Sequence, residues 1–106
     1  MNTKHDKVYG MTDGELKIKA AEFMGVKKLR GLLLPDYPND IAAAWKLVKC
    51  MADEYKAEIE IGGIGTEWEA EFLIVAEDNC ISLARGMSAE QAITRAFIIA
   101  MLALEA

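Results

Sequence analysis

Apolar residues in the first half of the chain recur at the spacing of an α-helix. Thr12 and Glu15 have the spacing of a capping box, and the apolar residues after them share one face, so we expect a helix over residues 13–24. A second helix is expected from a cap at Asn39 or Asp40 to about residue 55. Its apolar stripe, which should face the core, consists of Ile41, Trp45, Val48, Ala52 and Tyr55.

The spacing changes to strict alternation after residue 57. Residues 58–61 and 67–72 alternate acidic and apolar side chains around a five-residue glycine-rich loop, which predicts a β-hairpin. A third strand is expected over residues 80–84. The alternation assigns one sheet face to Ile59, Ile61, Trp68, Ala70 and Phe72, and the other face to Glu58, Glu60, Glu67, Glu69 and Glu71.

A second capping box at Ser88 and Gln91 predicts a last helix over residues 89–104. The element order is therefore α-α-β-β-β-α, and the fold class is α+β. We expect a sandwich in which helices pack on a three-stranded antiparallel meander sheet. A chain of 106 residues suits one domain, which we place at residues 12–106 after a flexible lead-in over residues 1–11.

The last helix contains nine consecutive apolar residues from Ala96 to Leu104. A helix that is apolar on every side must be covered on every side, and a sheet covers only one of them. We therefore expect an exposed patch that joins copies of the chain into a homo-oligomer. The expected interface residues are Phe97, Ile98, Met101 and Leu102. The alternative is that this helix is the central core helix of a monomer.

The chain has a net charge of -5, with seven acids and no base between Ala57 and Asp78. This balance argues against direct nucleic-acid binding, which requires a basic surface. We interpret the face with five glutamates as an acidic interaction face for a basic partner. The alternatives are a solvated surface, pairing with lysines (Lys17, Lys19, Lys27 or Lys28), a mimic of nucleic-acid phosphates, and a divalent-cation site.

No catalytic group, metal site or cofactor is predicted. The only histidine, His5, lies near the N-terminus, so neither Cys50 nor Cys80 has a base or a set of zinc ligands near it in sequence. The sequence shows no signal peptide, and its longest apolar run is too short for a membrane span, so we expect a cytoplasmic protein.

A phosphorylated ligand such as a nucleotide is the one small molecule that the sequence favours. Tyr37, Asp40 and Trp45 lie at or near the start of the second helix, whose N-terminus can attract an anion. Arg85 and Arg95 lie near the start of the last helix and could bind phosphate. The alternative is that the arginines pair with acids and Trp45 belongs to the core.

The segment from Leu34 to Trp45 reads Leu-Pro-Asp-Tyr-Pro-Asn-Asp-Ile-Ala-Ala-Ala-Trp, and the chain ends with a strand and the helix Ala92-Ile93-Thr94-Arg95-Ala96. These motifs resemble the phage ABA sandwich family of bacteriophage and prophage proteins. The resemblance implies a small α/β sandwich in the cytoplasm of an infected bacterium, and it implies no activity.

Taken together, these features predict a non-enzymatic phage accessory protein that acts by binding. Its expected role is counter-defence, either by sequestering a nucleotide signal or by masking a host defence protein. The alternatives are a phage structural or assembly module, an acidic mimic of nucleic acid, and an enzyme whose polar cluster the sequence does not reveal.

Overall fold

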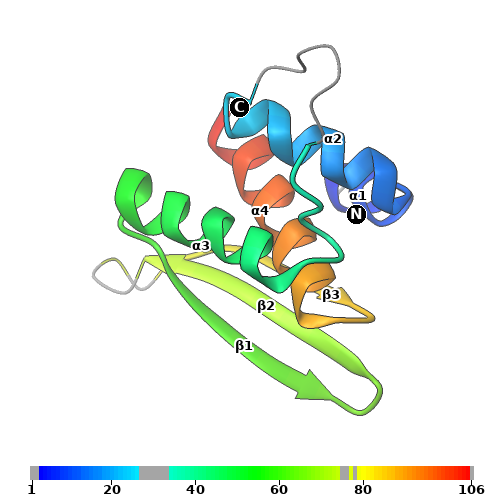
Figure 1. Ribbon diagram of the computed structural model, residues 1–106. Helices are drawn as coiled ribbons and strands as arrows, with labels where there is room; N and C mark the ends of the chain where they lie inside the picture. The colour runs from blue at the N-terminus through cyan, green and yellow to red at the C-terminus, as the bar shows by residue number, and fades with distance from the viewer. Residues whose placement is uncertain (1–2, 27–33, 75–76, 78, 106) are drawn as a thin grey trace.

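The protein folds with its helices packed on one side of a three-stranded sheet (Figure 1). The computed structural model describes residues 3–26, 34–74, 77 and 79–105. Residues 27–33, between the first two helices that the sequence predicts, lie outside this description. The elements are α1 (Thr3–Tyr9), α2 (Asp13–Phe23), α3 (Ile41–Tyr55), β1 (Glu58–Ile64), β2 (Glu67–Ile74), β3 (Asn79–Gly86) and α4 (Ala89–Glu105).

The helix starts follow the predicted caps. Thr12 Oγ1 accepts from the Glu15 N–H while Glu15 Oε1 accepts from the Thr12 N–H, which completes the capping box of α2. Asp40 Oδ1 accepts from the Ala42 N–H at the start of α3. At α4 the Ser88 hydroxyl accepts from the Gln91 N–H. These bonds satisfy N–H groups that the first turn of a helix leaves without partners.

The sheet is the predicted antiparallel meander, in the order β1-β2-β3. The hairpin between β1 and β2 is tighter than expected, because Ile64 pairs with Glu67 and leaves a turn of only Gly65 and Thr66. Gly65 has a φ of 61°, and a positive φ at the first turn residue suits the type II′ turn of two-residue hairpins. The predicted assignment of side chains to the two faces is confirmed, since Ile59 pairs with Phe72 and Glu60 with Glu71.

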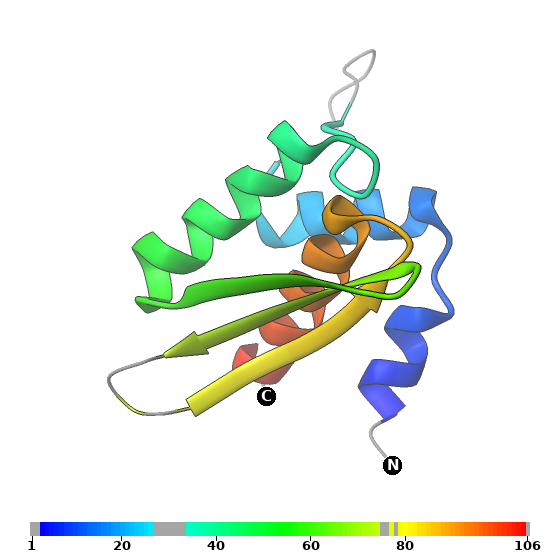
Figure 2. The ribbon, with the colours of Figure 1, turned by 90° about the horizontal axis from the view of Figure 1, so that it is seen from below.

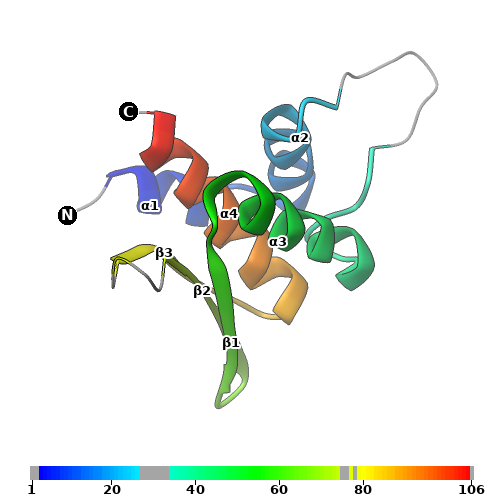
Figure 3. The same ribbon diagram turned by 90° about the vertical axis from the view of Figure 1, so that its left-hand side faces the viewer.

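Helix α4 lies at the centre of the molecule, where it packs against β2 and β3 and against the other three helices (Figures 1 and 3). Small side chains let it approach β3 closely. The Ser82 hydroxyl donates to the Ala96 carbonyl at 2.8 Å, and a Cβ built on Gly86 would come within 2.7 Å of Ala92 N. On its other side the rings of Phe97 and Phe23 meet edge to face, with centroids 6.4 Å apart.

The expected flexible lead-in is wrong, because residues 3–9 form α1 and this helix packs against α4. Val8 is completely buried in the core. A short segment with one strongly apolar residue carries little local helix signal, so its order comes from this tertiary contact.

The expected buried stripe of α3 is also wrong in part. The side that faces the core carries Ala43, Ala44, Leu47 and Met51. Ile41 and Trp45 are instead 48% and 51% exposed. The small alanines permit close packing against α4, and this rotates the larger side chains away from the core.

Candidate functional site

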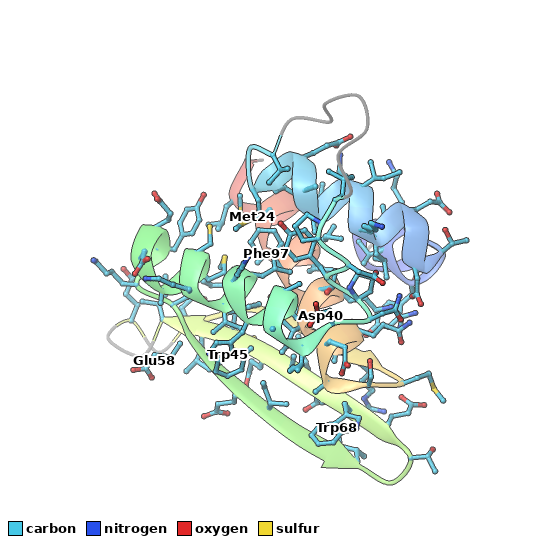
Figure 4. The ribbon with its side chains drawn as sticks, viewed as in Figure 1. Met24, Asp40, Trp45, Glu58, Trp68 and Phe97 are labelled. Carbon is cyan, nitrogen blue, oxygen red and sulfur yellow. The ribbon has the colours of Figure 1, made fainter. Side chains whose placement is uncertain are left out.

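The sheet has one face that no helix covers, and we call it the outer face. Figure 2 shows this face toward the viewer, with α2, α3 and α4 behind the sheet. The register places on it Glu58, Glu60, Glu67, Glu69, Glu71, Leu73, Leu83 and Arg85. Glu58 points away from the helices, while Phe97 lies among them (Figure 4).

The charges on the outer face are unevenly partnered. Arg85 Nε lies 3.3 Å from Glu69 Oε2, and this is the ion pair formed there by described residues. Toward the β1 side, Glu60 and Glu71 sit directly opposite each other, an arrangement that destabilises a sheet. Of the four lysines in the alternative of lysine pairing, Lys19 pairs with Glu22 on α2, Lys17 forms no ion pair with a described residue, and Lys27 and Lys28 lie outside the described residues. The face therefore keeps a concentration of negative charge near β1.

At Arg85 the edge of the sheet formed by β3 is covered by side chains from two helices. The N–H of Arg85 donates to the Tyr9 hydroxyl at 2.7 Å, and the Arg85 carbonyl accepts from Arg95 Nη1 at 2.9 Å. The Arg95 guanidinium also stacks on the Tyr9 ring, 4.9 Å from its centroid. Both backbone groups at this point of β3 are thus occupied.

The opposite edge, at β1, is open. β1 pairs with β2 alone, and no described residue makes a hydrogen bond to its other side. Helix α3 projects past β1 on the side away from β2 (Figure 2). Trp45 lies on the side of α3 that faces β1, and Trp68 lies near the far end of the hairpin (Figure 4). The open edge thus has exposed apolar side chains near it.

The residues expected to bind a phosphorylated ligand do not converge on one site. Tyr37 is 1% exposed, and burial, followed by the nearby Cys50, raises the pKa of its hydroxyl. Asp40 serves as the cap of α3, and Trp45 is exposed beside β1. Arg85 and Arg95 are brought together, but each is engaged, one with Glu69 and the other with Tyr9 and the Arg85 carbonyl.

The predicted interface on the last helix requires a correction. Phe97 and Ile98 are completely buried in the single chain, Met101 is 8% exposed, and Leu102 packs partly against the core. α1 and α2 occupy the side of α4 that the sequence analysis left uncovered. A second copy cannot reach Phe97 or Ile98 without displacing these helices, so α4 is the core helix of the alternative interpretation.

The thiols are unsuited to nucleophilic chemistry. Burial and the neighbouring Glu71 raise the pKa of Cys80 to about 11, although a hydrogen bond with the Ser82 backbone acts in the opposite direction. Burial also raises the pKa of Cys50, with further contributions from Glu54 and Asp53. A reactive cysteine requires a lowered pKa. Within the described part of the chain, no group of three potential metal ligands occurs and no helix is long and apolar enough to cross a membrane.

A cavity of about 290 Å³ lies away from the residues predicted to bind a phosphorylated ligand, although Leu102 of the predicted interface is part of its lining. It is lined by side chains of α1, the turn after it, α2 and the end of α4, namely Lys7, Met11, Glu15, Ile18, Lys19 and Leu102. Its volume is at the lower limit for small-molecule sites. The sequence analysis did not find it, because it depends on how α1 packs.

Comparison with protein-family models, curated proteins and solved structures finds no match for this chain. The resemblance to the phage ABA sandwich family therefore stays a prediction. An α-β-α sandwich has helices on both faces of its sheet, whereas the described part of this chain has its helical layer on one face.

The open edge at β1 was missed by the sequence analysis. Alternation identifies a strand but not its neighbours. The sequence Ile-Ala-Ala-Ala-Trp at the start of α3 could have indicated that Ile41 and Trp45 are exposed. It gives the helix one face of small residues and one face of large residues, and either face can pack against the core.

Proposed function

We propose that the chain is a non-enzymatic binding protein whose outer face docks on a basic surface of another protein. The observation that carries this proposal is the uncovered face itself, where glutamates from two neighbouring strands are accompanied by one described base, Arg85. Complementary charge favours the encounter with a basic partner and the choice of that partner. Leu83, which is also exposed on this face, adds apolar contact area.

The setting we propose is the cytoplasm of a phage-infected bacterium, with a host defence protein as the partner that is masked. This setting comes from the resemblance to phage ABA sandwich proteins. Masking is preferred over sequestration of a nucleotide because Tyr37 is buried and Arg85 and Arg95 are already engaged. Assembly of the chain into a homo-oligomer stays a prediction, now without an interface on α4.

The proposal is tested with two double variants that change net charge equally. Glu58→Gln with Glu60→Gln removes two carboxylates from the outer face, and Asp53→Asn with Glu54→Gln removes two exposed ones from the end of α3. Each immobilised protein is exposed to a bacterial lysate, and each retained protein is then purified and titrated by calorimetry. We expect the outer-face variant to bind its purified basic partner about tenfold more weakly and the α3 variant to bind as the wild type does.

Equal losses in the two variants would show that only net charge matters, and the proposal would then be wrong. Retention of acidic or neutral partners alone would contradict it as well. Release of the partner by competing DNA would assign the face to the alternative role of a nucleic-acid mimic.

A further inference from the structure

We infer that the partner contributes an extended segment of alternating basic and apolar residues, which adds to β1 as a fourth strand. This inference rests on the proposed function, since it describes how the basic partner would be held. It is carried by the direction of backbone groups on β1, by the apolar side chains above that edge, and by the charge on the outer face.

The hydrogen bonds of Arg85 fix which backbone groups of β1 are available. Its N–H and C=O both point away from β2, toward Tyr9 and Arg95. Directions alternate along antiparallel strands, so its partner Glu69 directs its own groups at Gly62 on β1. The neighbours of Gly62 must then point the other way. The free edge of β1 consists of the N–H and C=O groups of Ile59, Ile61 and Gly63.

Side chains beside the free edge specify the apolar half of the pattern. Ile59 and Ile61 lie on the inner face, where they pack partly against the core. Trp45 and Ile41, each about half exposed, belong to α3, the helix that projects past this edge. A strand added to β1 would lie below α3, and every second side chain would face these apolar groups.

The other side chains of an added strand would lie on the outer face beside Glu58 and Glu60. Both carboxylates are exposed, and no ion pair with a described residue engages them. Lysine or arginine at these positions would gain cross-strand pairing. A second copy of β1 would instead bring its own Glu58 and Glu60 to this edge, on a chain with a net charge of -5. Charge complementarity therefore favours a basic strand over self-pairing.

The test uses two capped synthetic peptides of about ten residues, built from equal numbers of lysine and valine. One alternates the two residues, and the other groups all lysines before all valines, so charge and composition match. Binding is measured by calorimetry at low salt, and amide hydrogen exchange of the full chain is followed by NMR. We expect the alternating peptide alone to slow exchange at Ile59, Ile61 and Gly63.

Gly63→Pro removes one N–H from the free edge, and Gly63→Ala is its matched control. The site of the new side chain is open, with no atom within 4 Å of a Cβ built on Gly63. Proline is tolerated on edge strands where its nitrogen faces away from the ladder. We expect the alternating peptide to bind Gly63→Pro about tenfold more weakly than Gly63→Ala, because a backbone bond is lost and the peptide carbonyl opposite it is left unpaired.

Failure of this inference differs from failure of the proposed function. Equal binding of both peptides to both Gly63 variants, with weaker binding only in the Glu58 and Glu60 variant, would overturn strand addition and leave the acidic docking face intact. If neither peptide binds, both the strand addition and the acidic docking face are refuted. The last outcome is measured by sedimentation velocity. If the wild type is a dimer and Gly63→Pro dissociates it, the segment that pairs with β1 belongs to a second copy of this chain, and the inference is overturned.

Discussion

The two edges of the sheet differ in whether their outward backbone groups have hydrogen-bond partners. At β3 the N–H and C=O of Arg85 are occupied by Tyr9 and Arg95, which come from α1 and α4. At β1 the corresponding groups of Ile59, Ile61 and Gly63 have no such partners among the described residues. Open edges invite pairing with other chains, and proteins usually protect them. Two side chains thus protect β3 at Arg85, whereas β1 has no comparable contact among the described residues and lies beside Glu58 and Glu60, so β1 is the edge where we expect a partner.

The largest expected effect comes from Gly86→Ala on the closed side. A Cβ there would lie 2.7 Å from Ala92 N, so β3 and α4 would have to separate. We expect a loss of about 2 kcal/mol in the free energy of unfolding, measured by urea denaturation. The matched change is Gly62→Ala on β1, where nothing lies within 4 Å of the added Cβ. Its stability should change by less than about 0.5 kcal/mol, and an equal loss in both variants would refute the contrast.

Tyr9→Phe should open the protected edge at one point. The variant keeps the ring under Arg95 but removes the hydroxyl that accepts from the Arg85 N–H. We expect a loss of about 1 kcal/mol in stability and faster hydrogen exchange at the Arg85 amide. Tyr55→Phe is the control, because no described group bonds to the Tyr55 hydroxyl. If the Arg85 amide exchanges equally fast in the wild type, the closure at β3 is not formed in solution.

The smallest expected effects concern charge on the outer face and differ in sign between its two sides. Glu60→Gln relieves repulsion with Glu71 and should stabilise the fold by a few tenths of a kcal/mol. Glu69→Gln removes the exposed pair with Arg85 and should destabilise it by a similar amount. Both differences should shrink in high salt, as chemical denaturation with urea at two ionic strengths would reveal. Shifts of the same sign would mean that net charge alone governs stability.

Local patterns were sufficient to predict most of the fold. The capping residues Thr12, Asp40 and Ser88 marked helix starts correctly, and alternation assigned the sheet faces. These features depend on neighbours a few residues apart, so they can be read without knowing the tertiary structure. The acidic face of the candidate site was predicted for the same reason.

The errors share one origin in long-range packing. Residues 3–9 carry a weak local helix signal, so the sequence analysis missed α1 and left one side of α4 without a cover. The interface predicted at Phe97 and Ile98 followed from that omission. The same limitation hid the open edge, because the exposure of Trp45 depends on which face of α3 packs against α4.

The central position of α4 has a consequence for synthesis of the protein. The contacts that bury α1, α2, α3, β2 and β3 are made largely to this helix, which comes last along the sequence described. While a ribosome is still translating residues 89–105, the earlier segments have no core to join. We therefore expect these earlier segments to complete their folding only once α4 has left the exit tunnel.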